Sequence, residues 1–260
     1  MTEIDSIREI AIRAAKKAGR ILTEGLKREI KISYKGELSL VTEIDRHSEE
    51  TIVALLHKHF PDHQILAEEG HDRTGASPYR WVIDPLDGTT NYTHHFPFFC
   101  VSIGVEIKGK VHLGVVFDPV RNELFFAEKG KGAFLNGRPI RVSAVRALRE
   151  SLLVTGFVRE VQTDPVNFDP FINFTMRVQG VRRTGSAALD LCYVACGRFD
   201  GFWELKLHPW DTAAGSIILT EAGGRLTDFS GKGYSIYDKE MLASNGKLHR
   251  QMIDVLQSRQ

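Results

Sequence analysis

The 260-residue sequence predicts a layered α/β protein, built as one compact domain with two lobes. In residues 1–145, two amphipathic helical segments accompany β-prone segments joined by short turns, which favours helices on a mostly antiparallel sheet. In residues 146–260, short β-prone and helical segments alternate, as in α/β proteins. No linker is long enough to require separate domains, so we expect one compact unit with two lobes. We expect the active site to lie between these lobes.

Composition and charge narrow the possible functions. The chain has 34 Lys and Arg against 33 Asp and Glu, so nucleic acid or an anionic membrane would have to bind through a local patch. No apolar run approaches the ~20 residues that span a bilayer, and the N-terminus lacks a signal pattern. We therefore expect a cytoplasmic protein without a membrane partner, whose three cysteines are reduced thiols.

Apolar spacing and capping residues define the elements of the first half. A helix is expected over Ile4–Leu22, where apolar residues recur every three or four positions, and Gly25 can end it. Thr42 and Asp45 form a capping box for a second helix that runs to about His59. Strands are expected over 30–34, 64–67, 81–83, 98–108, 110–118, 123–128 and 132–135.

In the second half, Gly185 and Ser186 begin a predicted helix that Gly197 ends, and Pro209 suits the first turn of the next helix. Asp211 then lies in that first turn, where an acid complements the helix dipole. Strands are expected over 152–155, 181–184, 202–205 and 242–244, and helices near 168–178, over 186–196, from 209 and from about 247.

The segment after the central strand carries the main chemical signal. Asp84 and Asp87 follow the apolar strand Trp81–Ile83 directly, at the strand edge where α/β sheets bind ligands. The turn Gly88–Asn91 leads into a helix whose N–H groups can hold a phosphate. Two carboxylates repel a phosphate unless divalent cations such as Mg²⁺ neutralise them. A strand-end turn with solvated acids is the simpler alternative on these residues alone.

A second strand, Gln64–Ala67, also ends in acids, Glu68 and Glu69, so we expect two strands to deliver carboxylates to one edge. Two other groups are weaker candidates for a metal site. They are Cys192 with Cys196, which lack further soft ligands, and the histidines His57, His59 and His63, which more simply form a solvated face.

Three blocks of this sequence resemble the inositol monophosphatase family of metal-dependent sugar and polyol phosphatases, which is related to fructose-1,6-bisphosphatase. The longest block is WVIDPLDGTTNYTHHFPFFCVSIG, from Trp81 to Gly104. The others are Leu40–Asp45 and His208–Gly215, the latter continuing to Glu221–Gly224. The resemblance spans the chain from end to end. It implies a layered αβαβα sandwich with mixed, mostly antiparallel sheets, and Mg²⁺-dependent hydrolysis of myo-inositol 1-phosphate and related phosphates.

The resemblance also implies roles for individual residues, with two or three Mg²⁺ ions in a lithium-sensitive site. One ion would acidify the attacking water and another would stabilise the leaving alkoxide. The implied metal ligands are Glu68, Asp84, the carbonyl of Leu86, Asp87 and Asp211. The implied catalytic residues are Glu68, Thr89, Glu69 and Asp45, with Asp45 holding the Thr89 hydroxyl. The implied substrate-binding residues are Asp87, Gly88, Thr89, Gly185, Ser186, Ala187, Glu204 and Asp211.

Lys35 resembles a mobile loop lysine of the family, in a loop one residue shorter than in the animal enzymes. The polar segment 71–80 is a predicted linker.

The aromatic run His94–Phe99 is too apolar for one core to bury completely. Apolar side chains that the core leaves unburied favour an interface, so we expect a homodimer formed through this run.

Alternative functions stay open at this point. A haloacid-dehalogenase-like phosphatase would use an aspartyl nucleophile in Asp-x-Asp spacing, whereas Asp84 and Asp87 are spaced Asp-x-x-Asp. Fructose bisphosphate and histidinol phosphate are alternative substrates for the same scaffold. A regulatory protein that binds RNA or the transcription machinery would use Arg182, Arg183 and Arg198 as a basic patch, in addition to catalysis.

Overall fold

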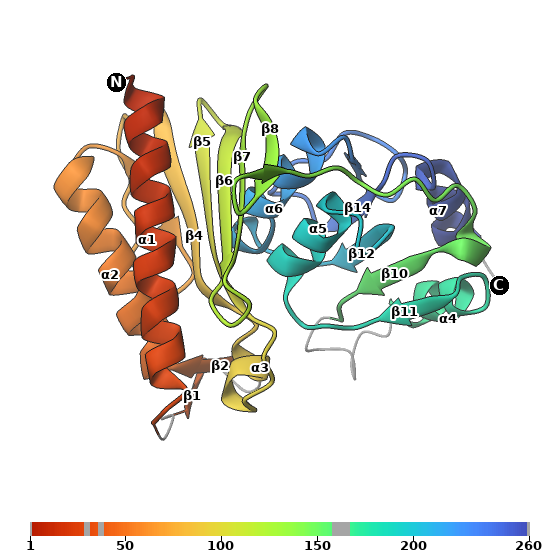
Figure 1. The fold of residues 1–260 in the computed structure, drawn as a ribbon, viewed down its shortest axis with the longest axis horizontal. Coiled ribbons are helices and arrows are strands. Elements are labelled where there is room, and N and C mark those ends of the chain that lie inside the picture. Colours follow the sequence, from red (N-terminus) through yellow and green to blue (C-terminus); the bar gives the residue numbers. More distant parts are fainter. Residues whose placement is uncertain (1, 29–31, 36–38, 158–166, 259–260) are drawn as a thin grey trace.

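The computed structural model describes residues 2–28, 32–35, 39–157 and 167–258. Its helices and sheets form five layers, α–β–α–β–α (Figure 1), which confirms the predicted layered α/β class. Two helices cover the outer face of a seven-stranded sheet, two lie between the sheets, and two cover the outer face of a five-stranded sheet. In that order the pairs are α1 (Glu3–Gly25) with α2 (Glu43–His59), α5 (Ala187–Ala195) with α6 (Pro209–Glu221), and α4 (Phe168–Thr175) with α7 (His249–Gln257).

The seven strands of the larger sheet lie in chain order, from β3 to β9. Only β3 and β4 are parallel, and every other neighbouring pair is antiparallel. Because parallel neighbours end at the same edge of a sheet, the residues after β3 and those at the end of β4 lie together. The strands are β3 (Gln64–Ala67), β4 (Tyr79–Asp87), β5 (Cys100–Ile107), β6 (Lys110–Asp118), β7 (Glu123–Glu128), β8 (Gly132–Leu135) and β9 (Arg138–Pro139).

The five-stranded sheet has the order β11-β10-β12-β14-β13. Strands β11, β10 and β12 are parallel, as expected for an alternating α/β half, and β14 and β13 add antiparallel neighbours. Short β13 was not predicted, whereas β9 follows the turn Asn136–Gly137, which is a strong sequence signal for a hairpin. The strands are β10 (Leu152–Thr155), β11 (Gly180–Arg182), β12 (Gly201–Leu205), β13 (Arg225–Thr227) and β14 (Glu240–Ser244). A separate hairpin joins β1 (Ile32–Lys35) to β2 (Ser39–Thr42).

Several predicted boundaries move by a few residues. The expected linker 71–80 is shorter, because β4 already begins at Tyr79. The helix expected to extend to 178 ends at Thr175, and the strand expected over 181–184 ends at Arg182. In the part of the chain that the structure describes, no helix has the length and apolar character needed to cross a bilayer.

The aromatic run His94–Phe99 divides between two cores and the surface. Phe98 lies in the middle layer, with its ring 5.5 Å from that of Tyr193. Phe99 lies in the outer core under α1 and α2. Two neighbouring residues can both be buried because they face opposite sides of the sheet, each of which has its own core. Phe96 is the large apolar side chain of this run that stays exposed, at 53%.

Candidate active site

A one-residue irregularity in β4 places the two central acids on one side of the sheet. Asp84 lies opposite Ser102 of β5 and Asp87 lies opposite Cys100, so β4 has one residue more than β5 over this stretch. Residues three apart on a regular strand face opposite sides. The extra residue cancels this alternation. Both carboxylates therefore face the middle helical layer.

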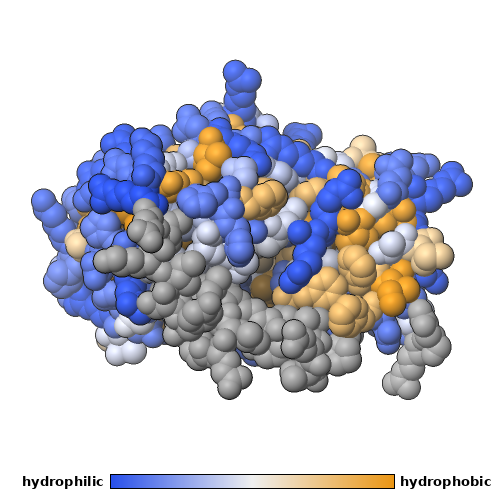
Figure 2. Space-filling model, turned by 90° about the horizontal axis from the view of Figure 1, so that it is seen from below, coloured by the Kyte–Doolittle hydropathy of each residue, from blue (hydrophilic) through white to orange (hydrophobic). Residues whose placement is uncertain are grey.

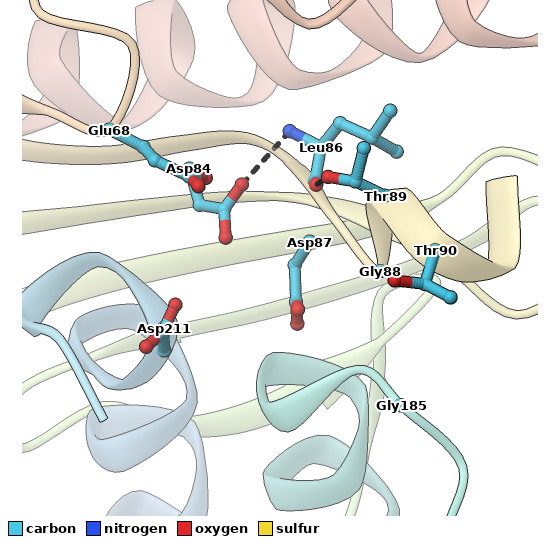
Figure 3. A pocket seen from close by; sticks show the side chains of 9 residues that line it. All are labelled: Glu68, Asp84, Leu86, Asp87, Gly88, Thr89, Thr90, Gly185 and Asp211. Carbon is cyan, nitrogen blue, oxygen red and sulfur yellow. Dashed lines mark hydrogen bonds between the residues drawn. The ribbon is translucent and has the colours of Figure 1, made fainter. Parts of the chain in front are cut away.

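A cavity of about 150 Å³ lies at this edge of the sheet (Figure 3). The carboxylates of Asp84, Asp87 and Asp211 lie around one opening, and that of Glu68 is beside Asp84. These acids come from β4, from α6 and from the residue after β3. The lining residues are Glu68, Asp84, Leu86, Asp87, Gly88, Thr89, Thr90, Gly185 and Asp211. The structure thus brings together all five residues proposed as metal ligands from the sequence.

Asp84 lies at the buried centre of the acid cluster. One carboxylate oxygen, Oδ1, accepts the Leu86 N–H at 2.9 Å, which fixes the side chain against the irregular part of β4. Burial, together with the charges of Glu68, Asp87 and Asp211, raises the pKa of Asp84 well above its usual value. A buried carboxylate among other acids is costly when ionised, and a bound cation would remove that cost.

The start of α5 fixes Asp87. The Ser186 hydroxyl and the Ala188 N–H donate to the same oxygen, Oδ2, at 2.7 and 2.8 Å. With Oδ2 held by these donors, Oδ1 is the oxygen left to face the cavity. Burial and the charge of Asp211 raise the Asp87 pKa to about 7, and the hydrogen bonds oppose the shift. Ser186 thus acts here through Asp87 and does not line the cavity.

Thr89 is positioned from two sides. Its single hydroxyl hydrogen has two acceptors, Asp45 Oδ1 at 3.1 Å and the Leu86 carbonyl at 3.2 Å. The other Asp45 oxygen accepts the Thr42 N–H at 2.8 Å, which completes the capping box of α2. The two roles considered for Asp45, helix cap and partner of Thr89, are therefore both present.

Glu204 and its surroundings form the other side of the site. A Cβ atom at Gly156 would overlap the Glu204 carboxylate, so this glycine makes room for that side chain. Burial and the charges of Asp211 and Asp87 raise the Glu204 pKa to about 8, while Arg183 opposes the shift. Glu204 therefore lies close to the acid cluster, although it does not line the cavity, and neither do Ala187, Asp45 and Glu69.

The oxygen donors fit a hard divalent cation. Carboxylates and a main-chain carbonyl are the ligands that Mg²⁺ and similar ions prefer. Burial and the neighbouring acids raise the pKa of Asp84, so a bound cation would favour its ionised form. Within the described residues, no three Asp, Glu, His or Cys side chains form a closed ligand set. The acids line the cavity from separate segments of the chain.

The weaker metal candidates do not form sites. His63 is stacked between Phe60 and Tyr79, with ring centroids 4.7 Å away on each side, while His57 and His59 contact arginines. Cys192 is buried in the middle core. The side chain of Lys35 lies outside the described residues, so its predicted role stays a prediction.

Sequence reasoning missed several residues that shape the site. Besides Gly156, Asn91 uses its amide group to join two loops, donating to the carbonyls of Phe98 and Thr184 at 2.7 Å each. Neither role has a local sequence signal, because the partners are far apart along the chain. Gly185, with φ of +87°, lies against the Asn91 amide.

A layered α/β fold with an oxygen-rich acid cluster beside backbone N–H groups is typical of hydrolases that cleave phosphate esters with the help of divalent cations. The sequence profile of the inositol monophosphatase family matches residues 3–260. The chain therefore belongs to the inositol monophosphatase family, and it is a metal-dependent phosphomonoesterase of that type.

Individual relatives agree with this assignment over nearly their full lengths. The chain is 45% identical to an inositol-1-monophosphatase of Synechocystis, covering 95% of this chain and 88% of the relative. It is 44% identical to Nus factor SuhB of Pseudomonas aeruginosa, covering 95% and 94%. The crystal structure of extragenic suppressor protein suhB from Bartonella henselae has a TM-score of 0.94 at 40% identity, covering 97% of this chain and 99% of that one.

Charge repulsion in the acid cluster yields a testable prediction. We expect Asp84→Asn to raise the melting temperature of the metal-free protein at pH 8, because it removes one buried charge from the cluster. Saturating divalent cation should raise the melting temperature of the wild type but not that of the variant. Thermal unfolding with and without chelator measures both effects. A lower melting temperature for the metal-free variant would show that Asp84 stabilises the fold in some other way.

Proposed function

We propose that the protein hydrolyses myo-inositol 1-phosphate and related sugar or polyol phosphates with two or three Mg²⁺ ions per site. The observation that carries the proposal is the cavity where carboxylates from three parts of the chain meet the turn Gly88–Thr89. Acids alone would repel the substrate, and N–H groups alone would not activate water. Their combination suits a phosphate ester held together with cations.

The residues of the site have separate roles in the proposed reaction. Glu68, Asp84, the Leu86 carbonyl, Asp87 and Asp211 would hold the Mg²⁺ ions. Bound Mg²⁺ supplies an acidified water and neutralises the charge of the phosphate and the leaving group. The Thr89 hydroxyl, oriented by Asp45, would position the attacking water. The N–H groups of Gly88 and Thr89 would bind phosphate oxygens, and Glu69 would support Glu68.

The alcohol part of the substrate would lie toward Gly185–Ala187 and Glu204. A carboxylate can accept hydrogen bonds from two neighbouring hydroxyls, which suits an inositol ring or a sugar. Relatives support this substrate class, because the structure of Staphylococcus aureus SaIMPase-II with bound inositol monophosphate has a TM-score of 0.80 to this chain at 29% identity. Fructose bisphosphate and histidinol phosphate remain the alternative substrates.

Phosphate release from a panel of inositol, sugar and histidinol phosphates tests the proposal directly. We expect turnover of inositol 1-phosphate only with Mg²⁺, and we expect Asp84→Asn and Asp87→Asn each to lower kcat by about three orders of magnitude. Lithium should inhibit in an uncompetitive or mixed manner with respect to substrate. Full activity in chelator, or a trapped aspartyl phosphoenzyme, would contradict the mechanism.

Gly156 offers a second way to test recognition by Glu204. Gly156→Ala should displace the Glu204 carboxylate, which is the flexible end of a side chain, and leave the acid cluster in place. We expect Gly156→Ala and Glu204→Gln to raise KM for inositol 1-phosphate about tenfold and to leave KM for a small aryl phosphate within about twofold. Gly75→Ala is the matched control, because its Cβ would meet only ordinary contacts. Equal losses on both substrates would mean that Glu204 supports the fold.

A regulatory binding role is the alternative from another class, since several relatives carry the name Nus factor SuhB. The proposed basic patch receives limited support. The two terminal nitrogens of the Arg198 guanidinium, Nη1 and Nη2, both donate to the Glu123 carboxylate. The guanidinium also lies 4.5 Å from the centroid of the Tyr193 ring. Its charge is therefore balanced locally, which leaves Arg182 and Arg183 of the three.

We further propose that the protein is a cytoplasmic homodimer. Exposed apolar side chains support an interface at Phe96 and along α4, where Phe168, Ile172 and Met176 recur every four residues and are 43%, 47% and 78% exposed. Figure 2 shows apolar side chains gathered on the face seen from below, on the side where α4 lies in Figure 1. A helix stripe of this kind usually packs against another surface.

Light scattering at micromolar concentration decides the oligomeric state. We expect a dimer for the wild type and a larger monomer fraction for Met176→Asp or Phe96→Asp, because each places a charge in the apolar contact. Phe98→Asp is unsuitable for this purpose, because Phe98 is a core residue. A monomeric wild type with full activity would overturn the proposal.

A further inference from the structure

Helix α2 carries three polar residues on its buried face. Asp45, Ser48 and Glu49 are each fully buried, and their spacing of three and four residues puts them on one side of the helix. A buried helix face is normally apolar, and buried polar groups are retained where they have partners. We call these three residues the polar face of α2. Asp45 already has a place in the site, through Thr89.

Ser48 contacts the irregular part of β4. Its hydroxyl donates to the carbonyl of Pro85 at 2.9 Å, and Pro85 lies between Asp84 and Leu86. An extra residue in a strand disturbs the ladder of backbone hydrogen bonds, so its carbonyl needs a partner from elsewhere. Ser48 supplies that partner between Asp84 and Leu86, whose carboxylate and carbonyl are proposed ligands.

Glu49 holds the loop that follows β3. Its Oε2 accepts the Glu69 N–H at 2.8 Å, and its Oε1 accepts the His71 N–H at 3.1 Å. The His71 ring nitrogen Nδ1 lies 2.7 Å from the same Oε1. A buried carboxylate that spans two N–H groups fixes the path of the backbone between them. That backbone begins directly after Glu68.

We propose that Ser48 and Glu49 are positioning residues for the divalent-cation site. With Asp45, they connect one rigid helix to three of the segments that supply ligands or position water, at Glu68, Asp84–Leu86 and Thr89. The remaining ligand, Asp211, lies on α6. The segments would otherwise be pushed apart by the repulsion between their acids. The inference rests on the proposed function, because it assumes that these acids bind Mg²⁺. It adds that helix α2 fixes the positions of these acids relative to one another.

Glu49→Gln tests the inference, with Glu50→Gln as the matched control on the exposed side of the same helix. A glutamine places an N–H₂ group where the carboxylate accepted an N–H, so one of the two loop contacts is lost. In metal-free protein, we expect amide hydrogen exchange at Glu69 and His71 to be at least tenfold faster than in the wild type. Calorimetry with Mg²⁺ alone should show affinity about tenfold weaker, as is typical for residues behind metal ligands.

Kinetics separates positioning from a general loss of stability. For Glu49→Gln, the Mg²⁺ concentration for half-maximal rate should rise about tenfold, while KM for inositol 1-phosphate at saturating Mg²⁺ stays within about twofold. Ser48→Ala should have a smaller effect in the same direction, and Ser48→Thr, which keeps the hydroxyl, should restore Mg²⁺ affinity. The Ser48 pair provides the test if Glu49→Gln does not fold.

The outcomes distinguish this inference from the proposed function. A wild type that neither binds Mg²⁺ nor hydrolyses inositol 1-phosphate would contradict the proposed function. A wild type that does both, combined with unchanged Mg²⁺ affinity in folded Glu49→Gln and Ser48→Ala, would overturn the positioning role alone. Equal effects of Glu49→Gln and Glu50→Gln would overturn it as well.

Discussion

The site depends on one extra residue in β4. Without it, Asp84 and Asp87 would face opposite sides of the sheet, one toward the outer helices and the other toward the middle layer. With it, both face the cavity, and the Leu86 carbonyl is brought to the same place. The irregularity has to be stabilised, because it breaks the regular ladder. The Leu86 N–H bond to Asp84 and the Ser48 bond to the Pro85 carbonyl provide that support.

The second constraint is the burial of negative charge. The pKa values of Asp84 and Asp87 are raised by burial and by neighbouring acids, so the metal-free fold holds these groups against their repulsion. The start of α5 lowers this cost at Asp87 by donating two hydrogen bonds to one oxygen. A bound cation would favour the ionised carboxylates, so cation affinity would depend on how the surrounding segments hold them.

The sequence predicted the parts of the site that have local signals. Strands that end in acids, a capping box at Thr42 and a turn at Gly88 are readable within a few residues, and all lie as expected. Asn91, Gly156, Ser48 and Glu49 were missed because their partners are distant along the chain. The burial of Phe98 and Phe99 in two different cores could not be predicted for a related reason, since the presence of a core on each side of one strand is a tertiary property.

Side-chain hydrogen bonds join the two sides of the site. The acids that would hold cations come mainly from the seven-stranded sheet, whereas Glu204 belongs to the five-stranded sheet. Asn91 donates a hydrogen bond to the carbonyl of Thr184, and Ser186 donates one to the carboxylate of Asp87. In the proposed function, Glu204 recognises the alcohol while the acids of the larger sheet hold the cations, so the two roles belong to different sheets. This separation gives a physical reason why one scaffold can support related phosphatases with different substrates.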